Sequence, residues 1–369
     1  MQNALHLIRV RFDWILLLIV MGLACIGLAN LYSSSIALGE SLYQTQAVWL
    51  GLGAIVSTLF AAIDYRFYGR WSYVGYGIVL FLLVLVPFVG STLNGSTRWI
   101  DVGFTLLQPS EFMKPMIVLV AARYFSTQDV KPGNSLLDLI SPFMLVIPPV
   151  ALVMLQPDLG TALVVLFIFL TVVMFEGVKL RTFIALATAT LLSAPLAWSF
   201  LFKDYQKERI LSFLDLEKDP YGPGWQVRQA LIAFGSAGMT GKGFLGGTQV
   251  HKGFVPYHES DFAAVNWAEE HGFIGMMLLL GVYIALIAWA LRIARNSRDR
   301  LGMLMAVGMA GMIFWHVVVN LGMVLGMLPV VGLTLPLVSY GGSSMITTMM
   351  AVGVLFSVSM RRDLNAQGT

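Results

Sequence analysis

Long, uninterrupted apolar runs separated by short clusters of charged residues dominate this sequence. About 20 consecutive apolar residues let a helix cross the hydrocarbon core of a membrane, where every backbone polar group must be satisfied internally. Hydrophobic residues form 57% of the 369-residue chain and charged residues only 12%, whereas soluble domains have about 45–50% and about 25%. The chain is therefore predicted to be an all-α polytopic membrane protein. A soluble enzyme, a disordered chain and a disulfide scaffold are excluded.

Ten apolar runs are predicted to be transmembrane helices: 14–32, 46–63, 72–89, 110–126, 141–155, 159–176, 182–201, 272–291, 301–326 and 342–360. The fifth run contains Pro142, Pro148 and Pro149. Because a proline inside a helix removes a backbone hydrogen bond, we expect this helix to be broken. A much longer segment, 202–262, separates the seventh run from the eighth. We therefore expect a single membrane domain over residues 1–369 with one large loop.

Lysine and arginine are distributed unevenly between the two sides of this arrangement. If the N-terminus is cytoplasmic, the inner segments hold fourteen of the 23, including Arg292, Arg295 and Arg298, and the short outer loops hold only Arg98. The other eight are Lys114 within a span and seven in the long segment 202–262, to which the rule for short loops does not apply. Short cytoplasmic loops carry the excess of basic residues in membrane proteins. Both termini are therefore predicted to be cytoplasmic, the loop at 202–262 extracytoplasmic, and the protein a multi-pass protein of the cytoplasmic (inner) membrane.

Ionisable residues inside the apolar runs are costly in lipid, so they are usually paired or functional. Glu111 and Lys114 lie three residues apart near the predicted outer end of the fourth run, where their side chains can face each other. They are candidates for substrate contact or for a structural ion pair. Asp158, at the outer turn before the sixth run, is a candidate for substrate contact or for a cap on the following helix.

Asp261 ends the long external segment and precedes an apolar stretch, 263–291, that is too long for one simple span. The part up to His271 is expected to form a surface or re-entrant helix, which places Asp261 at the rim of a cavity facing the membrane. Glu269 and Glu270 follow about two turns further along. They are a rival catalytic choice, because paired carboxylates can divide acid and base roles. The alternative is that they form a polar helix end.

A small, hydroxyl-rich loop that contains Ser339 and Ser343 precedes the tenth run. Arg98 and Lys242 also fall on the predicted outer side, as do Lys114, Asp158 and Asp261. A mixture of cations, carboxylates and glycine-rich backbone suits a substrate with a phosphate head and hydroxyl groups. The residues by themselves thus predict an externally open, polar site within the membrane, belonging to an enzyme or a transporter.

Several familiar motifs fail in this chain. The Gly-x-Gly-x-x-Gly match at residues 241–246 follows no predicted strand, and the Gly-Lys of a phosphate-binding loop is not followed by Ser or Thr. The five histidines have no metal-ligand spacing, so a zinc site is not expected. The net charge of +3 is too small to indicate nucleic-acid binding, and the single Cys25 is interpreted as inert.

Six sequence motifs occur in order along the chain. They are Arg-Trp-Ile-Asp at 98–101, Gln-Pro-Ser-Glu at 108–111 with Lys114, Gln-Pro-Asp-Leu-Gly-Thr at 156–161, Gly-Lys-Gly at 241–243 with Gly-Thr-Gln at 247–249, Asp-Phe at 261–262, and the loop at 336–343. In these motifs the chain resembles the SEDS family (shape, elongation, division and sporulation) over nearly its whole length. It departs from that family's Pro-x-x-His-Thr-Asp-Phe pattern: His258 is displaced by one position, and Glu259 precedes Ser260.

The resemblance implies a ten-helix peptidoglycan glycosyltransferase. Such an enzyme joins the disaccharide-peptide units of lipid II at the outer face of the membrane during cell elongation, with a class B penicillin-binding protein (a transpeptidase) as partner. The family's essential aspartate falls on Asp261, and its conserved Glu and Lys fall on Glu111 and Lys114. Lys114, Arg98 or Lys242 is expected to hold the substrate pyrophosphate. The sequence requires no cofactor, and a Mg²⁺ or Mn²⁺ ion at the pyrophosphate is a further expectation.

A lipid-linked donor carries its own leaving group, which agrees with the absence of nucleotide motifs from the sequence. Attack by the acceptor 4-hydroxyl on the α-linked anomeric carbon gives a β bond, so the configuration inverts. One displacement with a general base, assigned to Asp261, is sufficient. The alternative function is a flippase for lipid-linked precursors, which would also need many helices, buried charges and a broken fifth span.

Overall fold

The computed structural model describes residues 12–37, 39, 41–93, 96–103, 105–128, 140–177, 204–215 and 222–362, and five single positions between 178 and 203. Its helices are α2 (Trp14–Ala37), α3 (Leu42–Ala62), α4 (Tyr65–Val89), α5 (Pro109–Thr127), α6 (Ile140–Leu155), α7 (Leu159–Phe175), α9 (Asp204–Leu214), α10 (Pro223–Ala237), α11 (Ala263–Arg295), α12 (Arg300–Val324) and α13 (Gly342–Met360). Three short strands, β1 (Ser91–Leu93), β2 (Ser96–Asp101) and β3 (Leu106–Leu107), form a small antiparallel sheet between α4 and α5.

The described helices confirm an all-α polytopic membrane protein. α2, α3, α4, α11, α12 and α13 are long and apolar enough to cross a membrane, and α6 and α7 are shorter apolar helices. Every predicted span except 182–201 corresponds to one of the described helices, and that run lies mostly outside the described residues. α12 and α13 form the centre of the bundle: in the apolar 18-residue stretch of each helix, 72% and 78% of the residues are buried, respectively. The outer helices expose apolar side chains, such as Leu18, Val48 and Phe81, and these form the lipid-facing surface.

The prediction that the fifth span is broken is wrong, because α6 runs without interruption through Pro148 and Pro149. The hydroxyl of Tyr76 on α4 donates a hydrogen bond of 2.8 Å to the carbonyl of Leu145, four residues before Pro149. A neighbouring side chain therefore occupies the acceptor that the proline cannot use. Gln156 does the same for α4: its amide donates to the Leu83 carbonyl at 2.8 Å, four residues before Pro87.

α11 consists of two helical parts that meet at Gly272, whose φ of 63° and ψ of −158° are not helical. This confirms the expectation of a separate short helix up to His271. The backbone groups freed at the kink bind the segment 238–243: the carbonyls of Glu269 and Glu270 accept from the N–H groups of residues 242 and 243, each at 3.0 Å. A Cβ at Gly272 would come within 2.3 Å of the backbone nitrogen of Gly241. The Gly-Lys-Gly motif therefore serves a close backbone approach.

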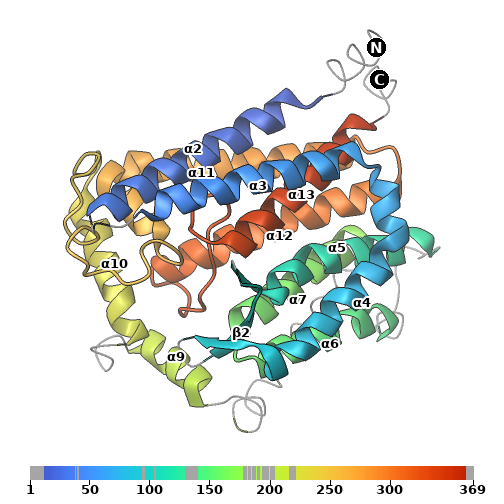
Figure 1. Cartoon of the computed structure of the whole chain (residues 1–369), viewed down its shortest axis with the longest axis horizontal. Coiled ribbons are helices and arrows are strands. Elements are labelled where there is room, and N and C mark those ends of the chain that lie inside the picture. Colours follow the sequence, from blue (N-terminus) through green and yellow to red (C-terminus); the bar gives the residue numbers. More distant parts are fainter. Residues whose placement is uncertain are drawn as a thin grey trace.

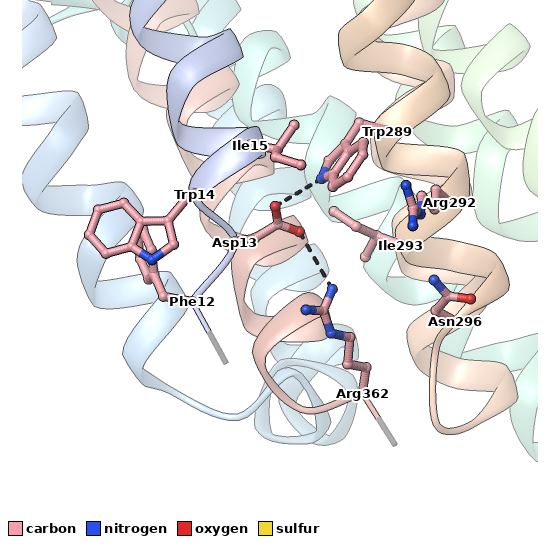
Figure 2. Close-up of a pocket in the computed structure, with 9 residues that line it drawn as sticks. All are labelled: Phe12, Asp13, Trp14, Ile15, Trp289, Arg292, Ile293, Asn296 and Arg362. Atoms are coloured by element: carbon pink, nitrogen blue, oxygen red, sulfur yellow. Dashed lines mark hydrogen bonds and ion pairs between the residues drawn. The ribbon is translucent and has the colours of Figure 1, made fainter. Parts of the chain in front are cut away.

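The two ends of the bundle differ. The start of α2 and the end of α13 lie close together at one end, and α9, α10 and the small sheet lie toward the other (Figure 1). At the end where α2 begins, Asp13 joins three helices, because its carboxylate accepts hydrogen bonds from Trp289 at 2.9 Å and Ser359 at 2.7 Å and lies 4.0 Å from Arg362. Figure 2 shows the contacts of Asp13 with Trp289 and Arg362, and all three residues line a cavity of about 300 Å³.

Candidate functional site

A polar cavity of about 660 Å³ lies where the small sheet, α9, α10 and the loops before α11 and α13 meet. Its volume is in the range of small-ligand sites, roughly 300–1,000 Å³. The lining residues are Ser96, Arg98, Trp99, Leu106, Gln108, Glu111, Arg209, Gln226, Tyr257, Glu259, Ser260, Asp261, Val330, Val331, Gly332, Thr334, Tyr340, Gly341, Gly342, Ser343 and Ser344. The cavity thus contains both cations and carboxylates and is bordered by glycine-rich backbone.

Asp261 lies in the turn immediately before α11, and backbone contacts fix its position. The Asn320 side chain donates to the Asp261 carbonyl at 2.8 Å and to the Leu333 carbonyl at 2.6 Å. This amide ties the turn to the loop between α12 and α13. A Cβ on Gly332, which has a φ of +73°, would lie 3.4 Å from an Asp261 carboxylate oxygen. The carboxylate therefore faces the cavity beside a backbone that carries no side chain.

The pKa of Asp261 is raised to about 6, mainly by burial. The carboxylates of Glu259 and Asp158 contribute to this rise in pKa, and the guanidinium groups of Arg209 and Arg98 oppose it. A carboxylate with a raised pKa is a stronger base than an exposed one while remaining mostly ionised at neutral pH. The side chain is suited to accepting a proton from a substrate hydroxyl.

Arg98 projects from β2 into the cavity and is fixed by the turn between α6 and α7. Its guanidinium donates to the Gln156 carbonyl at 3.1 Å and to the Pro157 carbonyl. Asp158 lies behind it: one oxygen caps α7 through the Thr161 N–H at 3.1 Å, and the other is 3.7 Å from Arg98. The predicted cap is confirmed. Asp158 does not line the cavity but touches Arg98, which does.

Glu111 and Lys114 form the predicted ion pair, with 2.6 Å between the Lys114 nitrogen and a Glu111 oxygen. The Lys114 side chain has no solvent exposure, and its nitrogen is also 2.7 Å from Nε2 of His316 on α12. Thr347 on α13 donates to the other Glu111 oxygen at 3.4 Å. Glu111 lines the cavity, whereas Lys114 lies behind it. The pair therefore links three helices directly beneath the cavity.

The two serines of the loop before α13 have different positions. Ser343 lines the cavity and accepts a 3.2 Å hydrogen bond from the Gln108 N–H. Ser339 is buried: its hydroxyl donates to the Ser260 carbonyl at 2.5 Å and accepts from the Leu335 N–H at 2.8 Å. Ser339 therefore joins its loop to the residue before Asp261 and does not border the cavity itself.

Lys242, Glu269 and Glu270 form a separate cluster away from the cavity lining. The Lys242 nitrogen lies 2.6 Å from a Glu269 oxygen, and Glu269 also accepts the N–H groups of residues 248–250. Glu270 accepts from the Leu245 N–H at 3.2 Å and lies 3.1 Å from His251. Both glutamates hold the loop that follows α10 and neither reaches the cavity with Asp261.

Arg209 is a cavity residue that the sequence interpretation did not single out. It comes from α9 in the long loop, and its guanidinium donates to the Val330 carbonyl at 3.0 Å. Together with Arg98 it places two guanidinium groups at the cavity. Arg209 belongs to a mixed-charge stretch typical of a solvated loop, and only the folding of α9 against the loop after α12 brings it here.

The displaced His258 does not enter the cavity. Its ring is buried, with Nδ1 3.1 Å from the Val255 carbonyl and 3.5 Å from a Glu259 oxygen. Glu259, which precedes Ser260, lines the cavity instead. In the described part of the chain, no three His, Cys, Asp or Glu side chains come together as metal ligands.

The fold and the cavity define a helical membrane protein with a charged site at one end of its bundle. Residues 11–364 match the family model of the FtsW/RodA/SpoVE cell cycle proteins. The chain is 37% identical to the peptidoglycan glycosyltransferase MrdB of Escherichia coli K12, covering 96% of this chain and 95% of that protein. It is 31% identical to the peptidoglycan glycosyltransferase RodA of Treponema pallidum, covering 95% and 98%. The chain belongs to the FtsW/RodA/SpoVE family.

Solved structures agree with this assignment. The structure of Thermus thermophilus rod shape determining protein RodA superimposes with a TM-score of 0.71 at 32% identity, covering 95% of this chain and 97% of that one. A chain from a structure described as structural coordination of polymerization and crosslinking by a peptidoglycan synthase complex superimposes with a TM-score of 0.80 at 35% identity. That match covers 94% of this chain and 97% of the other.

Proposed function

We propose that this protein is a peptidoglycan glycosyltransferase that joins lipid II units into glycan strands, and that Asp261 is its general base. The observation that carries the assignment of the base is the position of Asp261: a carboxylate with a raised pKa at a cavity that also holds Arg98 and Arg209. The names of the relatives, including MrdB and RodA, support the reaction class.

In the proposed reaction, the acceptor 4-hydroxyl attacks the anomeric carbon of the donor sugar. The new carbon–oxygen bond forms as the bond to the pyrophosphate breaks, the hydroxyl proton goes to Asp261, and the lipid pyrophosphate leaves with the bonding electrons. The guanidinium groups of Arg98 and Arg209 would stabilise the charge that develops on the leaving group. Because only one displacement occurs, the configuration at the anomeric carbon inverts and no covalent enzyme intermediate forms.

Other predicted site residues support this chemistry from behind the cavity wall. Lys114 would act through Glu111, Asp158 through Arg98, and Ser339 through the turn that carries Asp261. Ser343 remains a proposed substrate contact because its side chain lines the cavity. Lys242 is bound to Glu269 outside the lining, so its predicted contact with the pyrophosphate would need a substrate that extends beyond the cavity.

The decisive experiment supplies the purified protein with lipid II in detergent, with and without a class B penicillin-binding protein, and measures glycan chains by gel electrophoresis. Polymer formed by the wild type supports the proposal, and polymer seen only with the transpeptidase would also identify that protein as a required partner. Translocation of labelled lipid II in proteoliposomes, with no polymer under either condition, would instead identify a flippase.

The pKa of Asp261 predicts the acid side of the pH profile. A general base works only when ionised, so kcat/KM should fall as the pH drops through about 6, to about half at pH 6 and by about tenfold at pH 5. Initial rates of lipid II polymerisation between pH 5 and 8, with the thermal unfolding midpoint followed in parallel, would test this. A flat profile from pH 5 to 8 in a folded protein would exclude Asp261 as the base.

The proposed orientation places both termini on the cytoplasmic side of the inner membrane and residues 202–262 outside. In a Cys25→Ala background, Lys252→Cys should react with a membrane-impermeant thiol reagent in intact cells, and Arg295→Cys should react only after the membrane is broken. Both positions are exposed; Lys252 precedes α11, and Arg295 is the last residue of α11. The reverse labelling pattern would overturn the orientation.

A further inference from the structure

A second charged cavity, of about 400 Å³, lies at the other end of the bundle, where α2 begins and α13 ends. It is lined by residues from the first two turns of α4, the last turns of α5 and the start of α12 with its N-cap: Arg66, Arg70, Arg123, Ser126, Asp299, Arg300 and Leu301. Glu111 and Arg123 are twelve residues apart on α5, which corresponds to about 18 Å along the helix. This arginine cavity is therefore separate from the site that contains Asp261.

Two of its four arginines are neutralised by carboxylates. Arg66 donates to one Asp299 oxygen through Nε at 3.0 Å and Nη2 at 2.9 Å. Arg300 forms an ion pair with Glu176 and also donates to the Gln128 carbonyl at 3.2 Å. These pairs fix the ends of α4 and α12, and neither pair contributes a net charge to the cavity.

Arg70 and Arg123 have no ion pair or hydrogen-bond acceptor for their guanidinium groups within the described part of the chain. The Arg70 side chain is exposed and Arg123 is half-buried. Among the described residues, nothing therefore compensates two of the positive charges at the arginine cavity. Guanidinium groups bind phosphate oxygens through paired hydrogen bonds, so an anion with a phosphate group is the complementary ligand.

The surface next to Arg70 faces lipid. Trp71 and Phe67 are each 51% exposed, as expected for aromatic residues at the level of the lipid headgroups. Val74 and Ile78, four and eight residues after Arg70 on the same face of α4, are 52% and 57% exposed. An apolar track therefore begins at the arginine and runs toward the bilayer centre.

We propose that the arginine cavity binds the phosphodiester headgroup of an anionic phospholipid, whose acyl chain lies along the Val74–Ile78 face of α4. Basic pockets between membrane helices are suited to such headgroups. The adjoining apolar track favours a lipid over a water-soluble phosphate, which would gain nothing from that face. The site would fix the ends of α4, α5 and α12 relative to one another, and α5 carries Glu111 at its opposite end.

The test compares binding of phosphatidylglycerol and phosphatidylcholine with identical acyl chains to the purified full-length protein, by titration into detergent and by native mass spectrometry. Phosphatidylglycerol should bind the wild type and raise its thermal unfolding midpoint more than phosphatidylcholine does. Each arginine near an anionic headgroup contributes about fivefold in affinity. Arg70→Gln with Arg123→Gln should therefore weaken phosphatidylglycerol binding by about thirtyfold.

Arg295→Gln is the matched control, because Arg295 is an exposed arginine at the same end of the bundle but lines neither the arginine cavity nor the cavity beside Asp13. It should retain wild-type binding. Unfolding midpoints without lipid will show whether the double variant is folded, and Arg70→Lys with Arg123→Lys, which keeps both charges, should recover part of the affinity. Equal binding of the two lipids, equal loss in Arg295→Gln, or a midpoint shift by inorganic phosphate alone would overturn the proposal.

Discussion

Asp261→Asn should reduce glycan synthesis from lipid II by about 10²–10⁴-fold, the typical contribution of a general base. Asparagine has nearly the same shape and can still form hydrogen bonds, but it cannot accept the proton of the attacking hydroxyl. The contact that fixes this turn, from Asn320 to the Asp261 carbonyl, involves the backbone. The variant should therefore fold and insert normally, and the loss should appear in kcat.

Glu259→Gln is the matched control for this experiment, because it removes the neighbouring carboxylate from the same cavity. Glu259 raises the pKa of Asp261, so the variant should stay active and shift the acid limb of its pH profile to lower pH. Values of kcat/KM for lipid II, measured from pH 5 to 8, would show both effects, because kcat/KM reports the pKa values of the free enzyme. Near-normal rates in a folded Asp261→Asn protein would remove Asp261 from the base role.

Glu269→Gln and Glu270→Gln address the rival assignment. Both side chains bind the loop after α10, and neither lines the cavity. Their replacement should lower thermal stability more than it lowers the rate per folded molecule. If instead either variant lost polymerisation while its unfolding midpoint stayed unchanged, the catalytic role would move to the glutamates.

Lys114→Ala should have the second-largest effect, on folding as well as on activity. The Lys114 side chain is fully buried between Glu111 and His316, and leaving one member of a buried ion pair without its partner costs about 3–5 kcal/mol. The abundance of the protein in membranes and its unfolding midpoint should both fall. Lipid II polymerisation by the protein that remains folded should also be strongly reduced.

The exchange variant, Glu111→Lys with Lys114→Glu, separates a structural role from a role in the site. It restores an ion pair, so abundance and the unfolding midpoint should recover. It also places a cation where the cavity now has a carboxylate, next to Arg98 and Arg209. Activity should therefore stay low. Recovery of polymerisation by the exchange variant would show that the pair is purely structural.

The sequence alone determined the class of protein and much of its topology. Apolar runs report transmembrane helices reliably, because lipid offers no partner for the backbone and leaves the helix as the main solution. The sequence also predicted the separate helix before Gly272, from the length of the apolar stretch, and the pairing of Glu111 with Lys114, from their spacing. Both features depend on residues that are close together in the chain. The motif order identified the family.

Only the tertiary structure decided which polar residues share a cavity. Arg98, Glu111, Asp261 and Ser343 meet there, whereas Lys114, Asp158, Lys242 and Ser339 lie behind or away from it. The position of a residue along a transmembrane helix tells at which depth of the membrane its side chain lies. It does not tell whether that side chain points toward the cavity, toward another helix or toward lipid. That direction follows from helix packing and from contacts between distant segments, such as Asn320 with the Asp261 turn.

The continuity of α6 is a further example. Its prolines predict a break, because local sequence records the lost hydrogen bonds but not the residue that replaces them. That residue is Tyr76, about seventy positions earlier in the chain, whose hydroxyl binds the Leu145 carbonyl. Arg209 reaches the cavity in the same way, through a contact with Val330. Such long-range partners are set by the packing of the whole bundle, and no local pattern encodes them.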